Sequence, residues 1–149
     1  MTSSRTSRSV VVVLALALLQ QHAGAICVVF QFKELRANPN VALIFHGTVR
    51  EVQTTEAGEI VTFDVLRVWK GQVPRRITVY NHRIGVEWLS FARGTSYFID
   101  AYPLGAQART AFGLSASSSP TYGTGFCNAH QADTARARAD ADNDPGQAP

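Results

Sequence analysis

The sequence has little of what marks a catalytic or membrane-spanning chain. Only two cysteines occur among its 149 residues, and no Gly-x-Ser-x-Gly nucleophile motif is present. The longest uninterrupted apolar run, residues 10–19, is shorter than the roughly 20 residues that a transmembrane helix needs. There is no internal repeat and no Asn-x-Ser/Thr site for N-glycosylation. We therefore expect one globular domain of modest size, because the chain is too short for two ordinary ones.

The amino terminus has the pattern of a secretory signal peptide. Its parts are a basic region, an apolar run and a small-x-small site (Arg5 with Arg8, residues 10–19, and Ala23-Gly24-Ala25). We expect residues 1–25 to be removed, which leaves Ile26 and Cys27 at the start of a secreted or periplasmic chain. A lipid anchor on Cys27 is the alternative, but the bulky Ile26 stands where a lipoprotein has a small residue.

Export also changes the charge balance. The precursor has 14 basic and 11 acidic residues, and loss of Arg5 and Arg8 leaves 12 basic against 11 acidic residues, a net charge of +1. So small a charge gives no basic surface for nucleic acid or for an anionic membrane. We expect no nucleic-acid partner and no membrane span in the mature chain.

The two cysteines, Cys27 and Cys127, stand near the two ends of the expected domain. In an oxidising compartment an isolated pair is expected to form a disulfide, and only one connectivity is possible. A bridge that closes about 100 residues would stabilise the fold by roughly 4 to 5 kcal/mol in the chain-entropy model. Two free thiols, or half of a metal site, are the alternatives.

Residues 60–71 carry the strongest strand pattern. Apolar and polar residues alternate up to Val65, as in a half-buried strand, but beyond Leu66 the apolar set moves to the other parity at Val68. Such a slip would turn core side chains outward unless the strand contains a bulge, which we predict at Leu66 or Arg67. Bent strands let a small sheet close on itself, so the pattern favours a barrel.

The remaining elements follow from similar patterns and from turn residues. Further strands are expected at 41–52, 77–80 and 96–102, with a fifth strand or edge piece at 107–115. Gly47 within the first strand predicts a bulge, a bend or a close backbone approach. Other segments are expected to be a short helix or loop (33–40), a loop (115–125) and a disordered tail (133–149).

Polar side chains do not form a recognisable metal or cofactor site. His46, His82 and His130, with Asp64 or Glu87, could supply ligands, but no two of them have a ligand-like spacing. His46 is better explained as a residue on the outer face of the barrel. We predict neither a metal nor a cofactor.

The sequence supports a catalytic site no better than it supports a metal site. The hydroxyls at 115–119 lack a nucleophile elbow and an assignable base. The carboxylates Glu51, Glu56, Glu59 and Asp64 fall in a hairpin and its flanks, where solvated charges are ordinary. We predict a protein without enzymatic activity; an enzyme whose site has no recognisable motif is the alternative.

A set of short motifs occurs in a distinctive order. They are Cys27 behind a signal peptide, Phe45-His46-Gly47-Thr48-Val49, Thr62-Phe63-Asp64-Val65 leading to Trp69-Lys70-Gly71, Gly94-Thr95-Ser96-Tyr97-Phe98-Ile99, and a late Cys127. This order resembles the bacterial relatives of the tissue inhibitors of metalloproteinases, the netrin-like domains, over about residues 27–127. The resemblance implies an all-β, five-stranded OB-fold Greek-key barrel over residues 26–132, with short flanking helices and one disulfide.

The resemblance also implies a function. Inhibitors of this family begin with Cys-x-Cys and chelate a protease zinc through the amine and carbonyl of the first cysteine. Here Val29 stands in place of the second cysteine, and Ile26 precedes Cys27. We therefore expect a non-catalytic module that binds an extracellular or periplasmic protein, with metalloproteinase inhibition through the Cys27 segment as the alternative.

The residues expected to contact that partner belong to two segments. They are Ile26, Cys27 and Val28 at the mature amino terminus, and Trp69 with Lys70 at the end of the central strand. An exposed contact pair is one interpretation of Trp69 and Lys70. Packing of Trp69 across the end of the barrel is the other.

Overall fold

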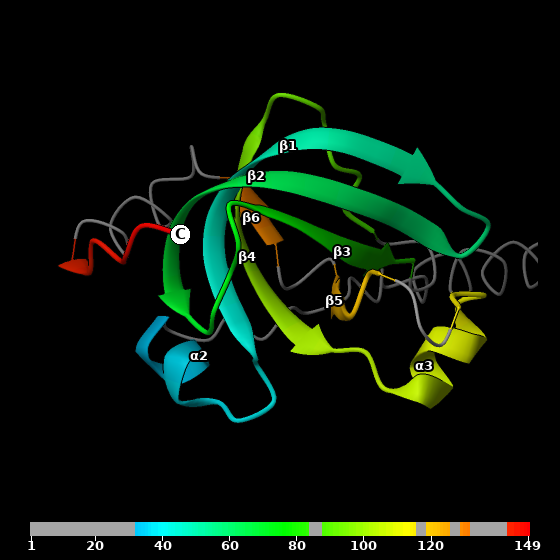
Figure 1. The fold of residues 1–149 in the computed structure, drawn as a ribbon, viewed down its shortest axis with the longest axis horizontal. Helices are drawn as coiled ribbons and strands as arrows, with labels where there is room; N and C mark the ends of the chain where they lie inside the picture. The colour runs from blue at the N-terminus through cyan, green and yellow to red at the C-terminus, as the bar shows by residue number, and fades with distance from the viewer. Residues whose placement is uncertain (1–31, 84–87, 116–118, 126–128, 132–142) are drawn as a thin grey trace, which may run out of the picture.

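The fold is a small barrel with a short helix near each end of its wall (Figure 1). The computed structural model describes residues 32–83, 88–115, 119–125, 129–131 and 143–149. Within these ranges it contains two helices and six strands: α2 (Phe32–Ala37), β1 (Leu43–Thr54), β2 (Gly58–Lys70), β3 (Arg76–His82), β4 (Ser96–Pro103), α3 (Ala106–Ala111), β5 (Tyr122–Thr124) and β6 (Ala129–Gln131). Strands lie at all four positions predicted before residue 103, and each bound differs from the predicted one by at most two residues.

Five of the strands close the barrel. The sheet order is β1-β2-β3-β5-β4, and β4 pairs again with β1, while β6 adds to β4. All neighbours within the five are antiparallel except β3 and β5, which are parallel. The predicted five-stranded OB-type barrel with short helices is confirmed.

Bulges in the β1–β2 ladder let these long strands wrap around the core. His46 pairs with Arg67 while Gly47 pairs with Val65, so Leu66 has no opposite residue on β1 and lies in a bulge. The bulge predicted at Leu66 or Arg67 is thereby confirmed. The close approach predicted at Gly47 is confirmed as well, because a Cβ there would lie 3.1 Å from the carbonyl oxygen of Asp64.

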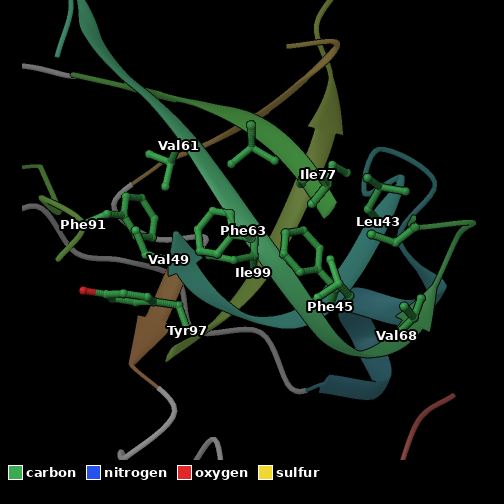
Figure 2. Close-up of a cluster of buried hydrophobic side chains, with 14 residues drawn as sticks. Leu43, Phe45, Val49, Val61, Phe63, Val68, Ile77, Phe91, Tyr97 and Ile99 are labelled. Carbon is green, nitrogen blue, oxygen red and sulfur yellow. The ribbon is translucent and has the colours of Figure 1, made fainter. Parts of the chain in front are cut away.

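The barrel interior is filled by apolar side chains (Figure 2). Phe63 packs edge-on against Phe45 and Phe91, with ring centroids 5.6 and 5.5 Å apart, and Phe91 packs on Tyr97 at 4.7 Å. These rings come from β1, β2, β4 and the segment before β4, and each is at most 5% exposed. Aromatic contacts across the barrel therefore tie the two long bent strands to the opposite wall.

The region after β4 differs from the prediction. The strand expected at 107–115 is wrong, because Ala106–Ala111 is the helix α3. The fifth strand is β5, which lies within the segment predicted as a loop. β5 is only three residues long and obtains its conformation from pairing with β3 on one side and β4 on the other.

Several predictions fall on residues outside the described ranges. These residues include the signal peptide (1–25), Ile26, Cys27, Val28, Glu87 and Cys127, so the predicted disulfide stays a prediction. Among the described helices, neither is long and apolar enough to cross a membrane.

The last seven residues, 143–149, lie against the barrel wall. The sequence predicted disorder over 133–149, of which residues 133–142 are outside the described ranges. Gln147 forms an antiparallel bridge with Val68 of β2. We call residues 143–149 the terminal segment.

Candidate protein-binding face

A second apolar cluster lies on the outside of the barrel. Neighbouring residues on each strand point to opposite sides, so Phe45 and Val68 enter the core while Ile44 and Trp69 face outward. The outer cluster consists of Val41, Ile44, Trp69 and Phe98 with Phe32 and Leu35 of α2. The six residues of α2 thus cover a part of the sheet around the ends of β1 and β2.

Trp69 is the centre of the outer cluster. Its ring lies 5.8 Å from that of Phe32 and 4.9 Å from that of Phe98, and the residue is only 6% exposed. Its indole N–H donates a hydrogen bond to the backbone carbonyl of Asp144 in the terminal segment. Of the two interpretations of Trp69, the structure shows the packed one.

Lys70 has a structural contact next to this cluster. Its Nζ donates to the backbone carbonyl of Asn38, at 2.6 Å, and so ties the end of β2 to the turn after α2. Trp69 and Lys70, which were predicted to contact a partner, therefore both form hydrogen bonds within the same chain. The other predicted contact residues, 26–28, precede α2 in the chain, but they lie outside the described residues.

The terminal segment binds along an edge of β2 that β3 leaves uncovered. β3 pairs with β2 only over Gly58–Asp64, whereas β1 pairs with β2 as far as Lys70. The N–H of Val65 still donates to the carbonyl of Arg75 at 2.8 Å, so we call the β2 residues 66–70 on the side away from β1 the docking edge. There the N–H of Val68 donates to the Gln147 carbonyl at 2.8 Å, and the N–H of Gln147 donates to the Val68 carbonyl at 2.7 Å.

Accessible apolar surface and open space accompany the docking edge. Leu66, in the bulge, is 48% exposed and is the large hydrophobic side chain that the described residues leave most open to solvent. A surface cavity of about 520 Å³ lies between the β2–β3 turn and the end of the terminal segment. Its lining comes from Val68, residues 71–74 and residues 147–149. These features make the docking edge the surface best suited to contact another chain.

His46 lies on the outer face and is stacked on Phe98. The two rings are 4.9 Å apart and nearly parallel, and the buried Nε2 has no hydrogen-bond partner among the described residues. Burial and the charge of Arg67, which is opposite His46 in the ladder, lower the pKa of His46. The stack on Phe98 gives His46 a packing role on this face.

His82 forms a second aromatic and polar group near α3. Its Nδ1 lies 2.7 Å from the hydroxyl of Tyr102, and its ring stacks on Phe112 at 5.5 Å. Burial lowers the pKa of His82, although a hydrogen bond with the backbone of Thr124 opposes this, and burial raises the pKa of Tyr102 to about 12. Both side chains are therefore mainly neutral at pH 7, and the contact between Nδ1 and the hydroxyl joins β3 to β4.

The four carboxylates considered for acid and base work do not meet at one site. Glu59 is buried inside the barrel and accepts hydrogen bonds from Asn81, Ser90 and the N–H of Phe91. Asp64 is exposed on the outer face, where Arg50 and Arg76 pair with it and lower its pKa. The other two, Glu51 and Glu56, are exposed near the hairpin.

The metal ligands that the sequence suggested are also dispersed. His46 and His82 belong to separate clusters, with different stacking partners. Among the described residues no group of three or more His, Cys, Asp or Glu side chains could hold a metal ion. Glu87 lies outside the described ranges, and of His130 only the backbone position in β6 is described.

Sequence reasoning missed the contact between Trp69 and the terminal segment. Residues 144 and 69 are far apart in the chain, and the Asp-Pro-Gly motif at 144–146 indicates only a turn. The bulge at Leu66 was the available signal, because a bulge opens a strand edge and moves side chains outward.

Comparison with known proteins does not assign this chain to a family. No protein-family model matches this chain, and no curated protein matches it significantly. The netrin-like resemblance therefore stays a prediction that depends on the order of the motifs.

Proposed function

We propose that this chain is an exported OB-type module that binds another protein and carries out no chemistry. The observation that carries the proposal is the filled barrel interior, where the large core side chains Phe45, Phe63 and Ile99 are at most 1% exposed. A ligand therefore has to bind outside, and the docking edge with Leu66 combines backbone groups that pair with an extended segment, apolar surface and space. The signal-peptide pattern at 1–25 supports a partner outside the cytosol.

The proposal is tested by capture with the exported, oxidised full-length chain. The bait is the wild-type protein, and the sample is the periplasmic or culture fraction of the producing organism. We expect stoichiometric capture of a protein, weakened by Leu66→Asp but not by Gln107→Asp. Both positions are exposed and both variants add one negative charge, but residue 107 lies on α3, away from the docking edge (Figure 1). A wild-type chain that is recovered alone, or equal losses in both variants, would contradict the proposal.

The alternative function, metalloproteinase inhibition, requires a particular amino terminus of the mature protein. Chelation of a protease zinc needs Cys27 as the first residue, with a free amine. Mass spectrometry of the mature protein distinguishes the two: an amino terminus at Ile26 agrees with the proposed module, and one at Cys27 supports inhibition instead.

A further inference from the structure

We propose that the docking edge of β2 accepts an extended partner segment of Asp-Pro-Gly type as an added strand, and that the terminal segment occupies this site in the isolated chain. This inference rests on the proposed protein-binding function and names its surface and the chemistry of its partner. The partner is a segment of another protein, and the terminal segment shows how it would bind.

Backbone hydrogen bonds provide the general part of the recognition. Val68 exchanges both of its backbone hydrogen bonds with Gln147, as in a hydrogen-bonded pair of an antiparallel ladder. These bonds use main-chain atoms only, so any extended segment that reaches the edge can make them. Without the terminal segment, Val68 would present an unpaired N–H and an unpaired carbonyl group, and such a strand edge is a ready template for pairing with another chain.

Side-chain donors of the barrel and α2 provide selectivity. The indole of Trp69 donates to the carbonyl of Asp144, and Arg67 Nη1 donates to the carbonyl of Pro145 at 2.8 Å. The guanidinium of Arg36 on α2 pairs with the carboxylate of Asp144. Three donors therefore face a carboxylate and two successive carbonyl groups. The site consequently favours an acidic residue three positions before the residue that bridges to Val68.

Gly146 adds a steric requirement. Its φ is +66°, in the left-handed region that is strained for a residue with a Cβ. A Cβ at this position would also lie 2.9 Å from Cε2 of Trp69 and 2.9 Å from the carbonyl oxygen of Val68. The backbone thus approaches the indole so closely that glycine is needed directly before the bridging residue.

The terminal segment leaves part of the site unfilled. The cavity of about 520 Å³ remains between residues 71–74 and residues 147–149, and Ala148 is among its lining residues. A partner segment with a larger apolar side chain at the position of Ala148 would bury more surface there. Such a segment would gain apolar burial that the terminal segment lacks, which favours its exchange for the terminal segment.

The test uses full-length chains and a synthetic acetylated peptide, Asn-Asp-Pro-Gly-Gln-Ala-Pro, with the sequence of residues 143–149. Gly146→Ala releases the terminal segment and leaves the docking edge open. The peptide is titrated into each chain, and the indole N–H resonance of Trp69 is followed. We expect saturable binding to Gly146→Ala, and binding at least about tenfold weaker to wild type, because the attached segment competes for the same site.

Two controls make the result specific. Gly105→Ala should behave as wild type, since Gly105 has φ −64° and nothing lies within 4 Å of its added Cβ. A peptide in which alanine replaces the glycine should not bind, and one with leucine in place of the alanine after glutamine should bind more tightly than the original. A Trp69 resonance that stays unmoved in Gly146→Ala at millimolar peptide, or equal affinities for wild type and variant, would overturn the inference.

Two further outcomes separate this inference from the proposed function. Wild-type dimers that are lost in Gly146→Ala would show that the occupant comes from a second copy of the chain, and would overturn the assignment to another protein. Partner capture by the exported chain, without peptide binding at the docking edge, would overturn this inference alone. Peptide binding without any captured partner would contradict the proposed function and leave the site itself established.

Discussion

Asn81 donates its side-chain amide to the carboxylate of Glu59, at 3.1 Å, inside the barrel. The two residues are opposite each other in the β2–β3 ladder, and Glu59 is 3% exposed. The carboxylate also accepts hydrogen bonds from Ser90 and from the N–H of Phe91, so it fastens the segment before β4 to the barrel end. A buried carboxyl group with this set of donors has a structural role.

Glu59→Ala should destabilise the fold strongly. The change leaves the amide of Asn81 and the N–H of Phe91 buried without this acceptor, which costs about 2 to 4 kcal/mol. Denaturant unfolding measures the loss. Glu56→Ala, at an exposed position of the same hairpin, is the control and should stay within about 0.5 kcal/mol of wild type. Equal stabilities for the two variants would contradict this role of Glu59.

Because of the bulge in β2, alanine substitutions at two nearby apolar residues should change the free energy of unfolding by very different amounts. Phe63→Ala removes a fully buried ring and should cost about 3 to 5 kcal/mol. Leu66→Ala should change the free energy of unfolding by no more than about 0.5 kcal/mol, because Leu66 points to solvent. A large loss of stability in Leu66→Ala would show that the register assigned to β2 is wrong.

Arg109 should be essential for the connection into β5. It is 4% exposed, and its guanidinium donates to the carbonyls of Ser115 and Pro120. Arg109→Met keeps much of the apolar stem but leaves these acceptors without their donor, at a cost of about 1 to 3 kcal/mol. Arg93→Met, at an exposed site, is the control and should be nearly neutral. Hydrogen exchange at β5 should increase in Arg109→Met alone; unchanged protection there would count against the assignment.

Stability should fall as the pH drops below about 6.5. The pKa values of His46 and His82 are lowered in the folded state, so the unfolded chain takes up protons in this range that the folded chain does not. The stability present above pH 6.5 is therefore lost progressively down to the folded pKa values. Asp64, whose pKa is also lowered, adds a separate loss at lower pH, below about 3.8.

His46→Phe isolates one part of this pH dependence. Phenylalanine keeps the stack on Phe98, and the buried Nε2 that it removes has no described hydrogen-bond partner. The difference in free energy of unfolding between pH 8 and pH 5 should therefore be smaller in the variant than in wild type. An unchanged difference would mean that the imidazole of His46 titrates normally in the folded protein.

The barrel could be predicted from sequence wherever the pattern was carried by local alternation. The parity change after Val65 indicated the bulge at Leu66, and Gly47 indicated a close backbone approach. β5 could not be found in this way, because its three residues obtain their conformation from β3 and β4. α3 has Arg109 as its only buried residue, so no apolar periodicity marked it as a helix.

Only part of the candidate site could be predicted from the sequence. Trp69 and Lys70 were singled out, but their contacts with α2 and the terminal segment depend on residues distant in the chain. Such long-range contacts leave no local pattern, and Asp144 and Gly146 resemble ordinary turn residues. The docking edge itself is defined by where β3 stops pairing with β2, which only the register reveals.

Site-directed photo-crosslinking at position 66 tests the central claim most directly. A photoreactive residue replaces Leu66 in the full-length exported chain, and a second chain carries it at Gln107 on α3, which is also exposed. The account predicts that position 66 yields a covalent adduct with a partner protein outside the cytosol and that position 107 does not. Adducts at position 107 alone, or none at either position while a partner is present, would show that this face of the barrel is not where the protein binds.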